Sequence, residues 1–327
     1  MWLFNRKQRS NDGATVRLFY SSDIHGSERC WLKFLNAAQF YGAQALVMGG
    51  DLTGKMLVPL VETPEGYRAT FLGQETLARD DAELATLEKN IRFNGFYPYR
   101  CAPDEYRRLA AEPDYLDHVF RRVMIDAVRR WVALAEERLA GSGVACFVMA
   151  GNDDEPALDD ALRSGSVVRN PDGCVLEWGQ HQILGESWVP PTPWHSPREM
   201  SEEELERRIR AVADRLDRDR PAIVVLHSPP YRSTLDDAPK VRDDLTVVTE
   251  GGQVVTAPVG SMAVRRVIEE FQPLLALHGH IHESRGAVRI GRTLCINPGS
   301  AYGEGVLHGA LITLEGERIR AHQLVSG

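Results

Sequence analysis

Seven residues whose side chains commonly bind metal ions follow short apolar runs along this sequence. They fall within five motifs: Asp23-Ile24-His25, Gly49-Gly50-Asp51, Gly151-Asn152-Asp153-Asp154, His227-Ser228-Pro229-Pro230 and Gly279-His280-Ile281-His282. Carboxylate, amide and imidazole ligands together suit divalent Mn, Fe, Co, Ni or Zn better than Ca. Because seven ligands exceed the needs of one ion, the set predicts two divalent ions that share a carboxylate.

The spacing within these motifs supports the same prediction. In Asp-x-His and His-x-His, residues i and i+2 project to the same side of an extended strand end. Glycines beside the ligands let the backbone turn sharply next to an ion. A single Asp or His after a strand is more often a cap or a turn residue, so the combination of motifs, and no single one, predicts the metal site.

The elements that must position these residues alternate between strands and helices. Continuous apolar runs rich in Val, Ile and Leu predict buried strands at 16–20, 45–48, 144–149, 223–226 and 274–277. One helix is predicted around Trp31 and Leu35, and another behind a capping box formed by Ser201 and Glu204. This alternation indicates a layered α/β fold, in which ligands bind at the carboxyl ends of the strands.

Two stretches depart from this alternation. Runs at 287–290, 293–296, 310–314 and 318–324, separated by glycine-containing turns, predict antiparallel strands that finish a second sheet. Residues 54 to 135 predict a hairpin (57–62 and 67–72), a short helix, and a longer helix that begins after Pro113 and stops at Gly141. We interpret them as a mainly helical insertion in a single domain spanning 1–327, and such insertions often shape a substrate site.

The motif series resembles that of the calcineurin-like metallophosphoesterases, which reads D-x-H, G-D, G-N-H-D/E, H and G-H-x-H in this order. The resemblance covers residues 16 to about 300 outside the insertion, and it implies a four-layer α/β/β/α sandwich. It implies two ions, one held by Asp23, His25 and His282 and the other by Asn152, His227 and His280, with Asp51 bridging them. Manganese is the first expectation for the metal, with Fe, Ni, Co or Zn as alternatives.

The resemblance also implies the reaction. Two cations neutralise the oxygens of a phosphate ester and lower the pKa of a shared water, and the bridging hydroxide then attacks phosphorus in line. The expected substrate is a small phosphorylated molecule such as a nucleotide, hydrolysed as a phosphodiester or a phosphomonoester. His278, which matches no ligand of the series, is expected to support the ligands from behind.

One position departs from the pattern, since Asp153 stands where many relatives have a histidine that assists the leaving oxygen. A charged carboxylate would repel a phosphoryl group, so Asp153 is either protonated, turned away, or paired with a cation from the insertion. We favour a side chain that is turned away or makes a structural bond. The missing histidine favours diesters, and Asp154 is expected to orient a ligand or a loop.

Other candidate residues follow from position alone. Tyr231 and Arg232, close behind His227, rank first among expected substrate contacts. Arginines and aromatics of the insertion could stack a base and clamp a phosphate, although a solvated helix face explains them more simply.

Composition restricts the alternatives. The formal net charge of −8 argues against indiscriminate binding of nucleic acid, and it leaves a nuclease that acts on nucleic-acid ends as an alternative. A non-catalytic scaffold or phosphate-ligand-binding protein is a second alternative, although a scaffold does not need all seven ligands. The five scattered cysteines predict neither a disulfide framework nor a structural zinc site.

The sequence contains no run of about 18 apolar residues, which predicts no membrane span. Residues 1–10 have the wrong order for a secretory signal, because their apolar residues precede the basic ones. The expected compartment is therefore the cytoplasm. The oligomeric state is left open.

Overall fold

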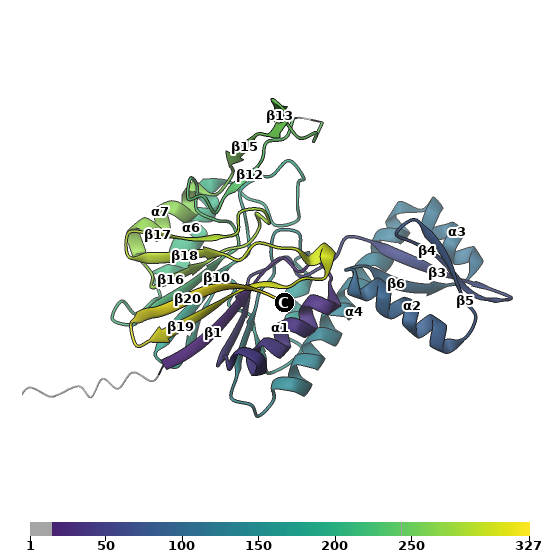
Figure 1. Cartoon of the computed structure of the whole chain (residues 1–327), viewed down its shortest axis with the longest axis horizontal. Helices are drawn as coiled ribbons and strands as arrows, with labels where there is room; N and C mark the ends of the chain where they lie inside the picture. Colours follow the sequence, from purple (N-terminus) through teal and green to yellow (C-terminus); the bar gives the residue numbers. More distant parts are fainter. Residues whose placement is uncertain (1–14, 243) are drawn as a thin grey trace, which may run out of the picture.

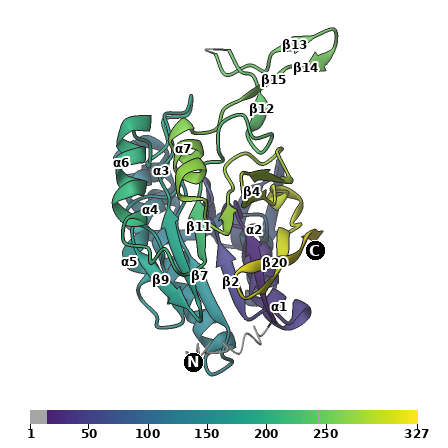
Figure 2. The same cartoon turned by 90° about the vertical axis from the view of Figure 1, so that its left-hand side faces the viewer.

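The computed structural model describes residues 15–242 and 244–327, and in them two six-stranded sheets stack face to face (Figures 1 and 2). The first sheet contains β1 (Thr15–Ser21), β2 (Ala45–Met48), β7 (Ala145–Val148), β8 (Val168–Arg169), β19 (His308–Glu315) and β20 (Arg318–Ser326), in the order β20-β19-β1-β2-β7-β8. The second contains β9 (Val175–Trp178), β10 (His181–Glu186), β11 (Ala222–Leu226), β16 (Leu275–Leu277), β17 (Gly286–Ile290) and β18 (Thr293–Asn297), in the order β17-β18-β16-β11-β10-β9. All five strands predicted from apolar runs are present.

The main core lies between the two sheets. Alternate residues of a strand point to opposite faces, so Leu18 and Tyr20 of β1 face the second sheet and meet side chains such as Ile223 and Val225 of β11. Phe19, on the other face of β1, packs among the helices that cover the first sheet. Strands buried on both faces explain why the sequence shows continuous apolar runs there.

Helices cover both outer faces and complete the four layers predicted from the resemblance. On the first sheet lie α1 (Glu28–Tyr41), α4 (Pro113–Leu139) and α5 (Leu158–Leu162), and the second sheet is covered by α6 (Glu202–Ala213) and α7 (Met262–Phe271). Trp31 of α1 stacks on Trp131 of α4, with ring centroids 5.3 Å apart. The predicted cap of α6 is also present, since the Ser201 side chain accepts a hydrogen bond from the Glu204 backbone N–H.

The prediction for the carboxyl-terminal strands was correct for one pair and wrong for the other. Strands β17 and β18 finish the second sheet as expected, whereas β19 and β20 extend the first sheet, where β19 pairs antiparallel with β1. The apolar residues of β19, including Ala310 and Ile312, face the core between the sheets. A period of two identifies a strand, but it does not say which sheet edge the strand joins.

The insertion forms a lobe beside the core (Figure 1). It contains the expected helices, α2 (Asp81–Phe93) and α3 (Pro103–Ala111), and the beginning of α4. It also contains a four-stranded sheet, of which only one hairpin was predicted: β3 (Leu57–Thr63), β4 (Gly66–Phe71), β5 (Gln74–Ala78) and β6 (Tyr97–Cys101), in the order β5-β4-β3-β6. Most residues of β5 are exposed, and β6 contains Pro98, so neither strand has the buried apolar pattern that would identify it.

The lobe joins the core at two places. Helix α4 serves both parts, since Val119 packs against Leu109 of α3 while Trp131 packs on the first sheet. The second place is a junction of three glycines, Gly26, Gly54 and Gly95. A Cβ on Gly54 would lie only 1.9 Å from the Gly95 carbonyl oxygen, and one on Gly26 would lie 2.5 Å from the same atom. The lobe backbone therefore touches the loop that carries His25.

A second projection, the β-arm, is built from β12 (Asp237–Pro239), β13 (Thr249–Glu250), β14 (Gln253–Val254) and β15 (Thr256–Pro258) (Figures 1 and 2). Strand β12 pairs with β15, and β13 with β14. Its base is tied to the core, because Ser284 Oγ donates to the Asp237 carbonyl oxygen at 2.6 Å. A 3₁₀ turn, η1 (Tyr302–Glu304), follows β18.

None of the helices within residues 15–242 and 244–327 combines the length and the hydropathy needed to cross a membrane. Residues 1–10, on which the expectation about a secretory signal rests, lie outside the described residues.

We predict that Gly54→Ala destabilises the protein by about 1–3 kcal/mol, because the added methyl group overpacks a contact between two backbones. Urea unfolding measures the change. Gly303→Ala is the matched control, since a Cβ there would meet nothing within 4 Å. Equal free energies of unfolding for the two variants would show that the junction relaxes at no cost.

Candidate metal centre

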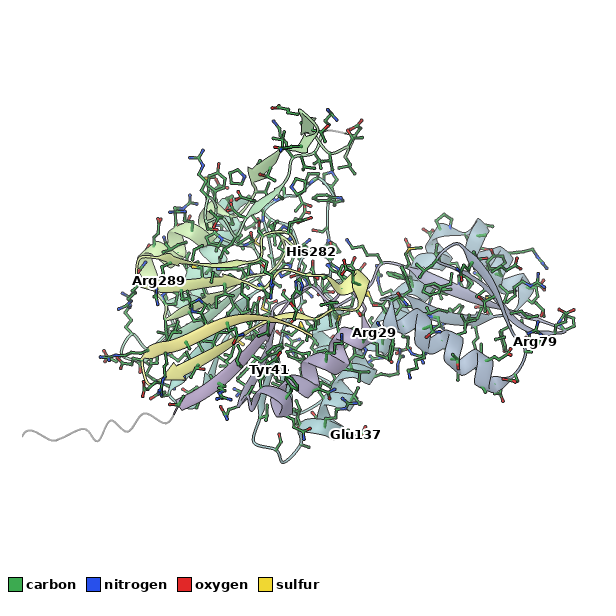
Figure 3. All side chains as sticks on the ribbon, viewed as in Figure 1. Arg29, Tyr41, Arg79, Glu137, His282 and Arg289 are labelled. Atoms are coloured by element: carbon green, nitrogen blue, oxygen red, sulfur yellow. The ribbon has the colours of Figure 1, made fainter. Side chains whose placement is uncertain are left out.

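All five motifs lie in the loops that directly follow β1, β2, β7, β11 and β16, and these loops meet at one edge of the stacked sheets. Of the seven predicted ligands, five are buried and two, His280 and His282, are partly exposed. Figure 3 shows His282 on the side of the core that faces the lobe, and Arg289 at the opposite end of the core. The sheet edge chosen from the sequence is therefore the edge at which the side chains gather.

The first group consists of Asp23, His25 and His282, whose donor atoms all lie within 4.8 Å of one another. The Nε2 atoms of His25 and His282 are 3.1 Å apart, and Asp23 Oδ1 is 3.6 Å from Nε2 of His282. Two nitrogens bound at right angles to one ion, at about 2.1 Å each, are separated by about 3 Å. This spacing fits two imidazoles that share one ion.

The second group consists of Asp51, His227 and His280, which also meet the 4.8 Å limit. Asn152 completes it, since its Oδ1 lies 2.7 Å from His280 Nδ1 and 3.1 Å from His227 Nε2. Asp51 lies between the groups. Its Oδ1 is 3.3 Å from His227 Nε2, and its Oδ2 is 3.6 Å from His25 Nε2.

Four of the seven residues have left-handed backbone conformations, with φ of 57° at Asp23, 37° at His25, 49° at Asp51 and 66° at His280. Such conformations cost free energy for residues other than glycine, and they concentrate at functional sites. Backbone hydrogen bonds hold two of these loops together, since His25 N–H donates to the Asp51 carbonyl oxygen at 2.9 Å. The strain supports a functional role for the cluster, independently of residue type.

The buried donor atoms fit a cation. Asp23 Oδ2 and His25 Nδ1 are buried and form no hydrogen bond within the described residues. A buried carboxylate oxygen without a partner is costly, and a divalent cation among these ligands would satisfy it. Asp23 Oδ1 is used differently, since it accepts the backbone N–H of His280 at 3.0 Å and so fixes one ligand loop against another.

Hydrogen bonds and nearby charges set the tautomer of His227 and the pKa values of His227 and His280. His227 Nδ1 lies 2.8 Å from the Gly49 carbonyl oxygen, which can only accept, so Nδ1 carries the hydrogen and Nε2 faces Asp51 and Asn152. Burial, followed by the charge of His227, lowers the pKa of His280 to about 4, which leaves its ring neutral at pH 7. Burial opposes the charged form of His227, but Asp51, Asp23 and the Gly49 carbonyl oxygen together outweigh it and raise the pKa of His227 above its ordinary value.

Asp153 takes the third of the three alternatives open from the sequence. Its Oδ2 lies 2.5 Å from Nζ of Lys55, which belongs to the segment that leads into the lobe, and 3.8 Å from His25 Nδ1. Of the two favoured alternatives, the side chain is not turned away, because Oδ2 lies near His25, whereas a structural bond is present, since Asn152 Nδ2 donates to Asp153 Oδ1 at 3.2 Å. Burial opposes the charge of Lys55, but Asp153, together with Asp51 and Tyr302, outweighs it and raises the pKa of Lys55.

Asp154 holds a loop in place, one of the two roles expected for it. Its buried carboxylate accepts hydrogen bonds from the backbone N–H groups of Leu52, Thr53 and Gly151 at 2.8–2.9 Å, and from the Thr53 hydroxyl at 2.6 Å. These bonds join the loop after β7 to the loop after β2, which carries Asp51. The Asp154 carboxylate is saturated by them, so it supports the site from behind.

Tyr231 and Arg232 remain expected substrate contacts. The Arg232 guanidinium lies 5.3 Å from the centre of the Tyr231 ring, and the backbone carbonyl oxygens of both residues accept hydrogen bonds from Arg265 of α7. His278 is buried, and its Nδ1 lies 2.8 Å from the Leu226 carbonyl oxygen. It therefore contacts the end of β11, directly before the predicted ligand His227.

Three arginines of the lobe pair with carboxylates of the lobe itself. Arg100 pairs with Glu88, Arg107 with Asp104 and Arg108 with Glu112. The hydroxyl of buried Tyr97 accepts the Gly54 backbone N–H at 2.9 Å. These contacts stabilise the lobe and its junction.

Sequence reasoning missed three residues around the site. Lys55 is one, and Tyr302 is another, with its ring centroid 4.6 Å from that of His25. The third is Arg198, which is only 2% exposed. Its backbone N–H donates to the Asn152 carbonyl oxygen at 3.1 Å, and its Nε donates to that of Asp154 at 2.8 Å. All three lie outside the five motifs, and no local pattern identifies them.

No protein-family model matches this chain. An uncharacterized protein of Methanocaldococcus jannaschii, MJ1162, is 31% identical over 150 residues, which are 45% of this chain and 61% of that protein, so the chain spans less than two thirds of this relative. The crystal structure of TT1561 of Thermus thermophilus matches with a TM-score of 0.51 and 14% identity, covering 96% of this chain and 98% of that one. Yfce, a phosphoesterase from E. coli, matches with a TM-score of 0.33 and 12% identity, covering 94% and 98%.

The chain has a four-layer α/β/β/α fold, the fold that the resemblance of its motif series to the calcineurin-like metallophosphoesterases implied. The fold predicted from the sequence is therefore confirmed. The Asp and His clusters give this chain the residues to bind divalent metal.

We predict that Asp51→Asn sharply lowers the metal content of the protein, because Asp51 lies between the two groups and its charge offsets that of the cations. Metal content after dialysis is measured by mass spectrometry. Asp160→Asn is the control, since Asp160 is exposed on α5. Wild-type metal content in Asp51→Asn would disprove a bridging role.

Arg198→Met should destabilise the protein by about 3–5 kcal/mol, because it leaves the buried carboxylate of Asp172 without its partner. It should also lower metal content, because the carbonyl oxygens of Asp154 and Glu155, just after Asn152, lose their side-chain donors. Arg121→Met, at an exposed pair with Glu155, is expected to cost less than about 1 kcal/mol. Similar urea midpoints for the two variants would rule out this role of Arg198.

Proposed function

We propose that this chain is a metal-dependent phosphoesterase that hydrolyses a phosphodiester, or a phosphomonoester, of a small molecule such as a nucleotide. The observation that carries the proposal is the pair of adjacent Asp and His groups, with Asp51 between them, at the carboxyl edge of the sheets. Two half-shells of oxygen and nitrogen ligands suit a pair of borderline divalent ions, of which manganese is the first candidate and Fe, Ni, Co and Zn are alternatives.

In this proposal, Asp23, His25 and His282 hold one ion, and Asn152, His227 and His280 hold the other. Bound there, two cations supply charge that neutralises phosphate oxygens and lowers the pKa of a water molecule. Other residues of the chain position the ligands. Gly49 fixes the tautomer of His227, Asp154 fixes the loop of Asp51, and Arg198 fixes the segment of Asn152.

The position of Asp153 supports the preference for diesters. Asp153 is paired with Lys55, so the position that carries a histidine in many relatives offers no imidazole to protonate a leaving oxygen. Esters with good leaving groups need this proton least. Tyr231 and Arg232 are the proposed contacts for the organic part of the substrate, since they follow His227 closely in the chain.

The test uses metal-stripped protein reloaded with Mn, Ni, Co, Zn or Mg. We expect metal-dependent hydrolysis of bis(p-nitrophenyl) phosphate that exceeds hydrolysis of p-nitrophenyl phosphate, with Asp51→Asn as the inactive control. Turnover that survives complete removal of metal, or that is unchanged in Asp51→Asn, would refute the proposal. Binding of two ions without turnover of either ester would favour a protein that binds a phosphate ligand without hydrolysing it.

A further inference from the structure

Lys55 lies beside the candidate metal centre, because it pairs with Asp153, and it belongs to none of the five motifs. It follows Gly54 of the three-glycine junction, so its backbone is held where the lobe meets the core. The Gly54 N–H, which donates to the Tyr97 hydroxyl at 2.9 Å, adds a further anchor. The Lys55 side chain itself is 63% exposed. The Lys55 backbone is thus held in place, while solvent and ligands can reach its ammonium group.

The partner of Lys55 places its charge beside the ligands. Asp153 Oδ2, 2.5 Å from Lys55 Nζ, lies 3.8 Å from His25 Nδ1. The Asp153 backbone N–H donates to Asp51 Oδ1 at 3.0 Å. The ammonium group is therefore one side chain away from residues of both ligand groups.

Tyr302 packs against the two histidines of the first group. Its ring centroid lies 4.6 Å from that of His25 and 5.9 Å from that of His282, and the side chain is partly exposed. Its loop is tied to the site, because Ser300 Oγ donates to the Asp23 carbonyl oxygen at 2.6 Å. An aromatic side chain therefore borders the same group of ligands that Asp153 and Lys55 approach.

We propose that Lys55 binds a non-bridging oxygen of the phosphate ester, and that Asp153 holds its ammonium group at the site until the ester enters. This inference rests on the proposed function and names a binding contact within it. An ammonium group is a compact charge on a flexible stem, well suited to a phosphate oxygen. Because its pair with Asp153 is partly open to solvent, exchanging that carboxylate for a phosphate costs little.

A contact between Lys55 and a phosphate oxygen predicts tighter binding of the ligand that carries more negative charge. Inorganic phosphate and monoesters carry up to two negative charges near neutral pH, whereas a diester carries one, so the former gain more from a nearby cation. Lys55 thus contributes binding of the phosphoryl group, and this role is separate from protonation of the leaving oxygen.

The test is calorimetric titration of the Mn-reloaded protein with inorganic phosphate, which requires no turnover. Lys55→Met should bind phosphate about tenfold more weakly, because a charge-assisted contact is lost. The control is Lys89→Met, an exposed lysine on α2 of the same lobe, which should bind like the wild type. Metal content should be unchanged in both variants. Wild-type affinity in Lys55→Met would overturn the inference and leave the proposed function intact.

Asp153→Asn tests the second half of the proposal. Loss of the competing carboxylate should tighten phosphate binding, and this gain should disappear in the double variant with Lys55→Met. An equal gain in both backgrounds would mean that Asp153 repels phosphate directly, which would overturn its role as the holder of Lys55. If the wild type with two bound ions does not bind phosphate at all, the proposed function itself fails, and the inference fails with it.

Discussion

The gathering of two buried carboxylates and four imidazoles at one sheet edge is the constraint on which the rest of this structure depends. Charged groups placed together out of water are stable only when each is paired, hydrogen-bonded or bound to a cation. The chain meets this constraint in part by holding three ligand side chains with backbone atoms. Asp23 binds the His280 N–H, Asp51 binds the Asp153 N–H, and His227 binds the Gly49 carbonyl oxygen. Fixed in this way, the side chains present their free atoms to a common centre.

The surroundings of the cluster supply the rigidity that this arrangement needs. Left-handed conformations at Asp23, His25, Asp51 and His280 persist only where neighbouring structure determines them. Asp154 and Arg198, both buried, supply that determination for the loops of Asp51 and Asn152. These two charged side chains do not point at the metal ligands. They hydrogen-bond the backbone of the loops that carry the ligands, which explains why buried charged groups lie behind the site. The strands themselves form the core between the sheets and are apolar, whereas the loops after them carry the ligands and are polar.

Much of this could be predicted from the sequence, because each ligand directly follows an apolar strand and the motifs occur in a known order. A layered α/β fold followed from the same runs, and the four layers from the resemblance of the motif series. What could not be predicted depends on pairing between distant segments. Lys55 lies in an ordinary turn, and only folding brings it to Asp153. Strand β19 shows its period of two, but its partner β1 lies near the other end of the chain. In the lobe, exposed β5 has no buried face to mark it, since neighbouring strands and α2 supply most of that small core.

Helix α4 has a consequence for how the lobe is joined to the core. Its 27 residues form one rod of about 40 Å that belongs to the lobe at one end and to the core at the other. A domain that closes over its ligand needs a hinge, and hinges lie where the chain can change its φ and ψ angles freely. Here a continuous helix and three close-packed glycine backbones occupy the places where a hinge would lie. The helix and the glycine junction therefore couple the lobe to the core at both places where the two parts join.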